Sequence, residues 1–415
     1  MWKVIYNVLV YVALPFFVFF ALFKRKLRRN IGERLFNSTK ATPVKNALWI
    51  HAASIGEAVI AETLINFLRK NKRELNLEFV VTTNTFYTKD LLLRKFNNAI
   101  NIYSLPLDLG LAIDRFIDGS TFKAIIIVET EIWPNLIWTA KKRGIPVVIL
   151  NGRISDRTLP SYKRFSFFLR DVLSDIDMVM AQSEEHRRRY ISIGMEPHKV
   201  ITTGNIKYYR DIKGQESSMQ KGDIVTFGSI KEKEMEGVFS VIKRLKGDMP
   251  GLSIYIAPRE LNLVSPIEYE LGKVFRITRY STIKTRLGQG QPVNADIVLV
   301  DTVGDLLDIY KKSRIAFVGG SLAPYGGQNI LEPLFFGTPV VFGPFIENFK
   351  EIADLIIAKK AGIMVKDYEE LYDNIRYLLG HHEKVEEMGE KGRDIIDMHR
   401  GYMEKTVDNI MQIID

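Results

Sequence analysis

Residues 319–333 (GGSLAPYGGQNILEP) combine residue types that can bind a phosphate or a nucleotide. They follow the apolar run 315–318, which predicts a buried strand. A strand that leads through a glycine-rich loop into a helix presents unpaired backbone N–H groups at the positive end of that helix, where anions bind. Glycine-rich turns are common, so the more specific signal is Glu332, three residues after Asn329 and directly before Pro333. The segment indicates a nucleotide-linked substrate.

An acid three residues after a possible helix cap also occurs at other predicted strand ends. The pairs are Ser54 with Glu57, Ser229 with Glu232, Asn329 with Glu332 and, more loosely, Thr302 with Asp305. Each pair can be a capping box, in which two residues satisfy backbone N–H groups at the start of a helix. Alternatively, the loops gather at one site, where a carboxylate at a helix start is held rigidly and points towards a ligand. The sequence leaves both interpretations open for each acid.

Short β-branched runs alternate with longer segments of helical apolar spacing, such as residues 62–73. Strands are predicted near residues 48–51, 79–82, 124–128, 147–150, 178–181 and 200–202 in the first half, and near 224–227, 252–257, 274–278, 297–300, 315–318 and 340–342 in the second. This alternation is typical of buried parallel sheets covered by helices. We therefore expect an α/β fold with two Rossmann-like, doubly wound domains. Ligands of such sheets bind beyond the carboxyl ends of the strands, so we expect the active site in a cleft between the two halves.

Composition narrows the possible functions. A chain of 415 residues is long enough for two domains of ordinary size, and its 46% hydrophobic content is that of a folded protein. The absence of cysteine excludes disulfides, thiolate metal ligands and cysteine nucleophiles. The six histidines show no metal-ligand spacing, so no metal is implied. A net charge of +9 suits nucleic acid, an anionic membrane or a phosphorylated substrate, but no nucleic-acid-binding motif accompanies it.

The N-terminus predicts a membrane attachment. Residues 4–23 are almost wholly apolar, interrupted by Asn7 and Pro15, and about 20 residues are enough to cross a bilayer. The basic cluster follows this run, and no small-residue cleavage site is visible, so a cleaved signal peptide is not predicted. The cluster consists of Lys24, Arg25, Lys26, Arg28 and Arg29. We expect an uncleaved anchor with the body of the protein on the cytoplasmic side. The alternative is a helix that lies in the membrane interface or against the body.

Several motifs, taken together, resemble the 3-deoxy-D-manno-octulosonic acid (Kdo) transferase family. They are residues 51–57 (HAASIGE), 129–135 (ETEIWPN), 151–155 (NGRIS), 204–207 (GNIK), 258–259 (PR) and the loop 319–333. The match runs in order through essentially the whole chain, including the N-terminal segment. The resemblance implies a glycosyltransferase of the two-Rossmann (GT-B) type. It would transfer Kdo from CMP-Kdo, with inversion, to a hydroxyl of the lipid A precursor at the inner membrane, in lipopolysaccharide inner-core synthesis. CMP-Kdo is a substrate, so no cofactor is implied.

The resemblance also implies roles for individual residues. Glu57 would be the base that accepts the proton of the acceptor hydroxyl, and Glu129 and Lys207 would stabilise the transition state. The CMP moiety would be held by Pro258, Arg259, Val303, Gly304, Asp305, Asn329, Ile330, Leu331 and Glu332, with Ser229 reaching the phosphate. These roles make chemical sense, because a sugar hydroxyl needs a base and departing CMP needs cations or N–H groups. A glutamate such as Glu332 can accept hydrogen bonds from two ribose hydroxyls.

The alternation of strands and helices stops at the polar stretch 211–222, which we interpret as a linker. Residues 1–23 would then be the anchor and 24–210 the acceptor domain. Residues 223–395 would be the CMP-Kdo-binding domain, and 396–415 a C-terminal helix that packs back towards the N-terminal domain. A basic and aromatic stretch, residues 153–170, suits an anionic lipid acceptor and a membrane face, or an ordinary helix whose aromatic residues are core.

Plainer interpretations stand beside these roles. Glu129 and Glu131 can cap or pair with Arg153, Lys207 can be a surface lysine, His51 a hydrogen-bonded core residue, and Trp133 and Pro134 loop packing. The chain also departs from the family pattern. Lys231, Glu260 and Gln328 stand where the family often has histidine, and Tyr209 stands in the place of an aspartate, so we assign no histidine a catalytic role. Two alternative functions remain: another membrane-associated GT-B enzyme that uses a nucleotide sugar, and a non-catalytic nucleotide-binding scaffold.

Overall fold

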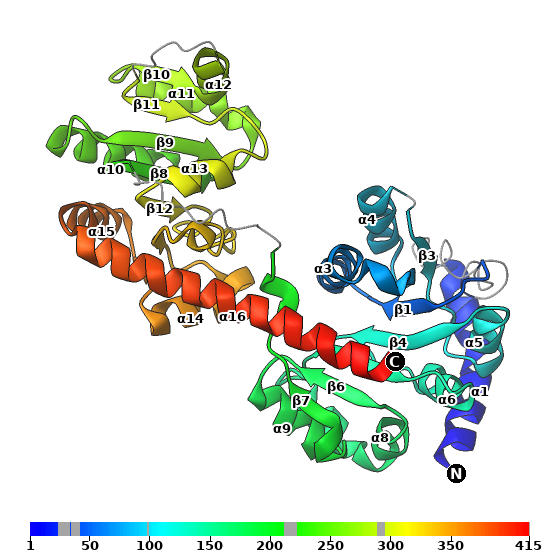
Figure 1. Cartoon of the computed structure of the whole chain (residues 1–415). Helices are drawn as coiled ribbons and strands as arrows, with labels where there is room; N and C mark the ends of the chain where they lie inside the picture. The colour runs from blue at the N-terminus through cyan, green and yellow to red at the C-terminus, as the bar shows by residue number, and fades with distance from the viewer. Residues whose placement is uncertain (24–33, 35–41, 98, 211–221, 289–294, 415) are drawn as a thin grey trace. The chain divides into compact units, whose positions relative to one another are not determined.

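The computed structural model describes residues 1–23, 34, 42–97, 99–210, 222–288 and 295–414. The chain forms two compact units, one from Met1–Asp211 with His399–Asp415 and the other from Ile212–Met398 (Figure 1). Most of the predicted linker, and the basic cluster from Lys24 to Arg29, lie outside the described residues. Each unit contains one parallel sheet with helices packed on it, so the expected pair of parallel-sheet α/β domains is confirmed.

The first unit contains a seven-stranded sheet in the order β3-β2-β1-β4-β5-β6-β7. Its strands are β1 (Ala47–His51), β2 (Glu78–Thr83), β3 (Asn101–Ser104), β4 (Phe122–Val128), β5 (Val147–Gly152), β6 (Met178–Ala181) and β7 (Val200–Thr202). Its helices are α1 (Trp2–Phe23), α3 (Ile55–Asn71), α4 (Phe86–Phe96), α5 (Gly110–Ile117), α6 (Pro134–Lys142), α7 (Leu159–Arg164), α8 (Ser166–Leu173) and α9 (Glu184–Ser192). The strand order reverses between β1 and β4, which places the ligand-binding edge of such a sheet beside these two strands.

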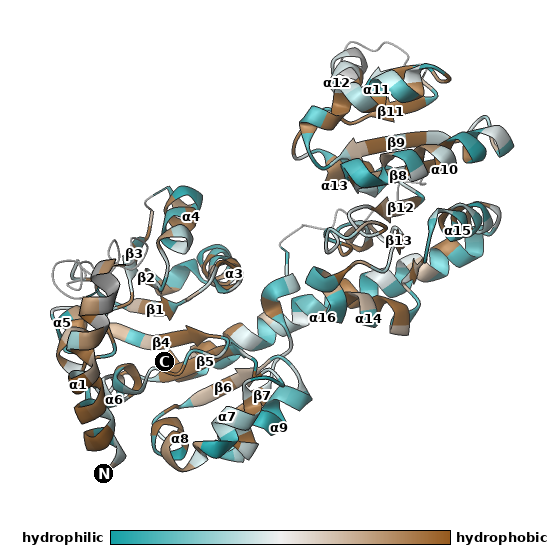
Figure 2. Ribbon diagram, turned by 180° about the vertical axis from the view of Figure 1, so that it is seen from behind, coloured by the Kyte–Doolittle hydropathy of each residue, from teal (hydrophilic) through white to brown (hydrophobic). Residues whose placement is uncertain are grey.

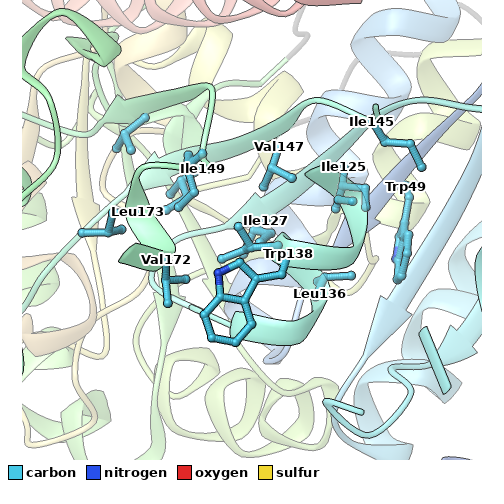
Figure 3. Close-up of a cluster of buried hydrophobic side chains, with 14 of the residues drawn as sticks. Trp49, Ile125, Ile127, Leu136, Trp138, Ile145, Val147, Ile149, Val172 and Leu173 are labelled. Carbon is cyan, nitrogen blue, oxygen red and sulfur yellow. The ribbon is translucent and has the colours of Figure 1, made fainter. Parts of the chain in front are cut away.

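The central strands of this sheet are buried because apolar side chains cover both faces. Figure 3 shows one cluster, in which Trp138 of α6 lies among side chains of β4 and β5 such as Ile127 and Ile149. Alternate residues such as Ile126 point into the opposite cluster, which α3 and the last turns of helix α16 (His382–Ile414) cover. The colours of Figure 2 show the same apolar strands. This double burial explains why β1, β4 and β5 read as continuous apolar runs.

The second unit contains a seven-stranded parallel sheet in the order β10-β11-β9-β8-β12-β13-β14. Its strands are β8 (Ile224–Ile230), β9 (Ser253–Pro258), β10 (Ile277–Arg279), β11 (Ile297–Leu299), β12 (Ile315–Val318), β13 (Val340–Phe342) and β14 (Gly362–Met364). Its helices are α10 (Met235–Asp248), α11 (Val264–Gly272), α12 (Tyr280–Gly288), α13 (Leu306–Lys312), α14 (Lys350–Lys359), α15 (Tyr368–Gly380) and the first part of α16. Here the order reverses between β8 and β12.

The edge strands differ most from the prediction. β3 and β14 were not predicted, and β10 begins at Ile277 rather than at residue 274. These strands have three or four residues and lie at sheet edges, where one side is uncovered and partly exposed residues interrupt the apolar run. Helix α16 also begins at His382, well before the predicted residue 396.

The N-terminal helix α1 packs against the first unit through its first turns. The ring of Tyr6 stacks on Phe168 of α8 with centroids 5.6 Å apart, and its hydroxyl donates to Asp108 at 2.7 Å. The Trp2 ring also lies edge-on to the Phe168 ring, with centroids 6.5 Å apart. None of the helices in the described ranges has both the length and the apolar character needed to cross a membrane.

Candidate active site

Glu57 lies in the first turn of α3, directly after the carboxyl end of β1. The Ser54 hydroxyl accepts from the Glu57 N–H at 3.3 Å and donates to Glu57 Oε1 at 2.8 Å. Glu57 Oε2 accepts from the Ala53 N–H at 2.7 Å. The predicted capping box is therefore present, but its acid closes on the Ala53 N–H instead of the Ser54 N–H.

The environment of Glu57 also changes its acidity. Burial raises the pKa of Glu57 from 4.5 to about 7, although the hydrogen bonds from Ser54 and Ala53 lower it. The negative charges of Glu129 and Glu131 add to the rise. A carboxylate with a pKa near 7 suits a general base at physiological pH. The geometry therefore supports both interpretations of Glu57, because the cap holds the side chain in place while burial tunes its proton affinity.

Glu129 directly follows β4, the neighbour of β1, and has a left-handed backbone with φ of +62°. Its N–H donates to Leu150 O at 2.8 Å, and its carbonyl accepts from the Tyr190 hydroxyl at 3.0 Å. A non-glycine residue in this region is strained, and such strain gathers at functional sites. The backbone thus holds Glu129 at the carboxyl edge of the sheet.

Glu131 forms a separate polar group near this edge. Glu131 Oε2 lies 4.0 Å from His51 Nε2 and accepts from Asn84 Nδ2 at 3.2 Å. The interaction with the His51 ring chiefly lowers the pKa of Glu131. His51 itself is buried, with Nδ1 at 3.1 Å from Thr82 O. Glu131 therefore lies beside His51, and the two acids Glu57 and Glu131 have pKa values shifted in opposite directions, which is the pattern of acid–base sites.

Lys207 stands on a short 3-10 helix, η4 (Ile206–Tyr208), after β7 of the same sheet. The Asn205 side chain caps this turn by accepting from the Lys207 N–H at 3.0 Å. Lys207 is half-buried, and no residue in the described ranges pairs with its ammonium. Tyr209, which replaces the family's aspartate, is buried against Phe67 with ring centroids 5.6 Å apart.

In the second unit, three residues predicted to bind the nucleotide, Ser229, Pro258 and Arg259, lie at the carboxyl ends of β8 and β9. Ser229 has a left-handed backbone with φ of +57°, at an irregularity in the pairing of β8 with β9. Pro258 ends β9, and the Arg259 N–H donates to Ile230 O at 2.9 Å while its guanidinium is exposed.

Two departures from the family pattern interact with each other at this edge. The Lys231 ammonium forms an ion pair with the carboxylate of Glu260. The same ammonium lies 5.4 Å from the centre of the Tyr325 ring, within cation–π range. A lysine and a glutamate thus occupy neighbouring positions where two histidines are common.

The first part of the glycine-rich loop corrects the prediction of bare N–H groups. The carboxylate of Glu234 accepts from the N–H groups of Gly320, Ser321 and Leu322 at 2.6, 3.0 and 2.9 Å. Glu234 is fully buried, and it also accepts from the Lys231 N–H at 3.1 Å. The backbone N–H groups that were expected to bind an anion of the ligand therefore bind the carboxylate of Glu234.

This contact also displaces the predicted Ser229–Glu232 capping box. The acid that closes the turn is Glu234, three residues after Lys231, and lysine is not a side-chain cap that the sequence pattern would reveal. Gly319 permits the close approach, because a Cβ there would lie 2.8 Å from Ser229 O and 2.9 Å from Glu234 Oε2.

The polar groups in the second part of the loop bond to one another. Asn329 Oδ1 accepts from the Leu331 N–H at 3.2 Å, and Asn329 Nδ2 donates to Glu332 Oε1 at 3.2 Å. The side chains of Ile330 and Leu331 are buried, so only their backbone can meet a ligand. The predicted helix start is wrong, because only a short 3-10 helix, η7 (Pro333–Phe336), follows, and it is too short for a strong helix dipole.

The 303–305 segment precedes α13. Val303 is 84% exposed, and Gly304 has φ of +94°. The Asp305 carboxylate pairs with Lys284 at 2.7 Å, which lowers the pKa of Asp305. Helix α13 begins at Leu306 with Asp305 in the N-cap position, so Thr302 is not its cap and the looser capping box of Thr302 and Asp305 is not formed.

Two parallel-sheet α/β units, each with polar residues at the carboxyl ends of its strands, define a fold of the GT-B class. A UDP-GlcNAc 2-epimerase of Neisseria meningitidis, solved with bound UDP-GlcNAc, shares this fold. It matches with a TM-score of 0.54 and 16% identity over 89% of this chain and 99% of that one, so the likeness concerns the fold alone.

Residues 29–210 match the family model described as 3-deoxy-D-manno-octulosonic-acid transferase. A Haemophilus influenzae 3-deoxy-D-manno-octulosonic acid transferase is 30% identical, covering 98% of each chain. A Fusobacterium nucleatum bifunctional glycosyltransferase/methyltransferase is 34% identical over 88% of this chain, which spans 57% of that protein's length. The chain belongs to the Kdo transferase family of glycosyltransferases, which confirms the resemblance of its motifs.

Proposed function

We propose that the protein transfers Kdo from CMP-Kdo to a hydroxyl of the lipid A precursor, with inversion at the anomeric carbon. Family membership supports Kdo transfer. The observation that carries the mechanism is Glu57, which sits at a rigid helix start, accepts two hydrogen bonds and has its pKa raised to about 7. Such a carboxylate can take the proton of a weakly nucleophilic hydroxyl.

The proposed reaction is a single displacement. The acceptor hydroxyl oxygen attacks the anomeric carbon of Kdo and forms the new glycosidic bond. The bond between that carbon and the phosphate oxygen breaks, and CMP leaves with the electron pair. Glu57 receives the hydroxyl proton. Attack from the face opposite to CMP inverts the configuration.

Charge stabilisation falls to other residues in this proposal. Lys207, whose ammonium has no ion pair among the described residues, and Glu129, whose charge acts on the pKa of Glu57, would stabilise the transition state. In the second unit, the exposed guanidinium of Arg259 and the hydroxyl of Ser229 would bind the phosphate. Glu332, oriented by Asn329, would accept from the ribose hydroxyls.

The remaining assigned residues would shape the nucleotide pocket. Pro258 and the turn formed by Val303, Gly304 and Asp305 follow strand ends of the second sheet and would contact CMP mainly through backbone and apolar surface. Ile330 and Leu331 are buried and would contribute their backbone groups. No cofactor enters this reaction, since CMP-Kdo is the donor substrate.

The proposal includes attachment to the cytoplasmic face of the inner membrane through α1. Several apolar side chains of α1 are more than half exposed: Val4, Val8, Leu9, Val12, Phe16, Phe19 and Phe23. Phe165 and Phe167, from the basic and aromatic stretch, are also exposed and belong to the same unit. Apolar side chains of this kind can enter the headgroup region beside anionic lipids, where a lipid-linked acceptor resides.

A lipid assay tests the proposal. The protein is incubated with CMP-Kdo, generated in situ, and tetraacyl lipid A precursor, and the lipid mass is measured. A mass increase of one or more Kdo units, absent when UDP-N-acetylglucosamine replaces the donor, is expected. Transfer from the UDP sugar alone would favour another GT-B activity, and no transfer from either donor would favour a binding scaffold. The anomeric configuration of the product, read by NMR, tests inversion.

A further inference from the structure

Asn151 is a buried residue to which the proposed reaction assigns no role. It lies near the carboxyl end of β5, the neighbour of β4, and its exposed fraction is 1%. Its backbone is left-handed, with φ of +56°. Only two other non-glycine residues at carboxyl strand ends share this conformation in the described residues, Glu129 and Ser229, and both are assigned to the site. Strain of this kind persists where the surrounding structure requires it.

The Asn151 side chain holds the turn that carries Lys207. Asn151 Oδ1 accepts from the Ile206 N–H at 3.1 Å, and Ile206 directly precedes Lys207. Gln182 Nε2 donates to the Asn151 carbonyl at 3.1 Å, and Asn205 Nδ2 lies 3.5 Å from Gln182 Oε1. Three amide side chains therefore connect the ends of β5 and β6 with the backbone on which Lys207 stands.

Helix α16 holds the same turn from its other side. Gly204 packs so closely on the Tyr402 ring that a Cβ there would lie 2.1 Å from it. The ring of Tyr208 stacks on His399 at 5.7 Å, and His399 stacks on Tyr402 at 5.5 Å. The Thr203 N–H also ties this segment to the sheet, by donating to Ala181 O at 3.1 Å, but the amide of Asn151 bonds closest to Lys207 in the chain, at Ile206.

We propose that Asn151 is a positioning residue that acts through Lys207, because its amide fixes the Ile206 N–H and thereby the backbone position from which the Lys207 side chain extends. The proposal rests on the function assigned above to Lys207. The side chain of a lysine is flexible, but the position of its Cα limits where the ammonium can lie. A displacement of a catalytic group by about 1 Å can lower the rate about 100-fold.

The test uses Asn151→Gly, since glycine adopts a left-handed backbone without strain and removes only the amide. The matched control is Asn46→Gly. Asn46 also has a left-handed backbone, with φ of +53°, and donates from its amide to Leu75 O at 2.8 Å, but it precedes β1 at the opposite edge of the same sheet. We expect kcat of the Asn151→Gly variant to fall about 10- to 100-fold, with KM for CMP-Kdo within about threefold of wild type. The Asn46→Gly variant should keep kcat within about threefold.

A double-mutant cycle with Lys207→Ala identifies the route of the effect. If Asn151 acts through Lys207, the double variant should be no more than about threefold slower than Lys207→Ala alone. Losses that multiply in the double variant, or a rise of KM with unchanged kcat, would overturn the positioning role while leaving Lys207 in the mechanism. Full activity of Lys207→Ala would instead remove Lys207 from the proposed function.

A second variant keeps the test decisive if Asn151→Gly does not fold. Asn205→Ala removes the cap on the Lys207 N–H from a half-buried position of the same network. We expect the same loss of kcat at constant KM and the same lack of further loss in the Lys207→Ala background. A fully active Asn205→Ala protein would show that the turn does not need this network.

Discussion

Replacement of Glu57 by glutamine separates its capping role from its role as a base. Burial raises the pKa of Glu57 from 4.5 to about 7. At about 1.36 kcal/mol per pKa unit this is about 3.4 kcal/mol, which partial hydration reduces to about 2–3 kcal/mol. The native state binds this proton more tightly than the unfolded state, so the destabilisation is absent below pH 4.5 and complete above about pH 7.

The stability difference between the Glu57→Gln variant and wild type should therefore depend on pH. At pH 4.5 Glu57 is protonated in the native state and, like glutamine, has one carbonyl oxygen that can accept from the Ala53 N–H, so urea unfolding should find the two proteins within about 1 kcal/mol. At pH 8 the variant should be more stable than wild type by about 2–3 kcal/mol, because wild type then carries the buried charge. Glu74→Gln, an exposed position after the same helix, controls for charge alone. A stability difference that does not change with pH would refute the desolvation of Glu57.

The rate of Kdo transfer gives the second measurement on the same variant. Wild-type kcat/KM should rise with pH through about 7, and Glu57→Gln should lose about 100- to 10,000-fold without this pH dependence. Its affinity for CMP should be unchanged, because the residues assigned to CMP belong to the other unit. Near-normal turnover would return Glu57 to a purely structural role and make Glu129 or Glu131 the next acid to test.

Three further predictions concern other parts of the chain. Arg259→Ala or Glu332→Ala should weaken CMP binding by about 1.5–3 kcal/mol in calorimetry. The control Arg244→Ala breaks an exposed ion pair with Glu369 and should leave CMP binding unchanged. Unchanged affinity in both Arg259→Ala and Glu332→Ala would remove these residues from the pocket. Burial lowers the pKa of His399 to about 4, so wild type should lose stability as pH falls from 6.5 towards 4, because the unfolded state binds the proton first. His399→Phe should therefore become more stable relative to wild type over this range in urea unfolding, and a difference of equal size at pH 8 would show that protonation is not the cause. The combined change of Val8, Val12 and Phe16 to serine should release the protein from anionic vesicles in a flotation assay without loss of activity on detergent-dispersed acceptor; unaltered flotation would contradict membrane attachment by this face.

The central strands could be predicted from the sequence because their environment is uniform. Residues of β4 such as Ile125 and Ile126 face opposite clusters, and both clusters are apolar, so the run has no polar interruption. β3 and β14 could not be predicted, because an edge strand of three or four residues is only half covered and its pattern resembles a loop. The two sheets could therefore be predicted from local sequence, while their edge strands depend on packing that the sequence pattern does not show.

The same division applies to the site. Glu57 could be found because its cap, Ser54, is three residues away and both belong to one local pattern. The contacts of Glu234 with Gly320, and of Asn151 with Ile206, join residues far apart in the chain, and no local spacing indicates them. Sequence reasoning could locate the strand ends that carry the chemistry, but not the side chains that hold those ends in place.

The buried carboxylate of Glu234 holds the backbone of the glycine-rich loop in place without a ligand. In many phosphate-binding loops the incoming anion supplies the charge that aligns the backbone, so the empty loop has conformational freedom to lose. Here the aligning charge is a permanent part of the chain, bound to Gly320, Ser321 and Leu322. If CMP-Kdo binds this loop as proposed, it would meet a segment that is already ordered, and less of its contact energy would be lost in ordering the loop. A residue that lies 86 positions before Gly320 in the sequence thus determines how rigid the loop is before any ligand arrives.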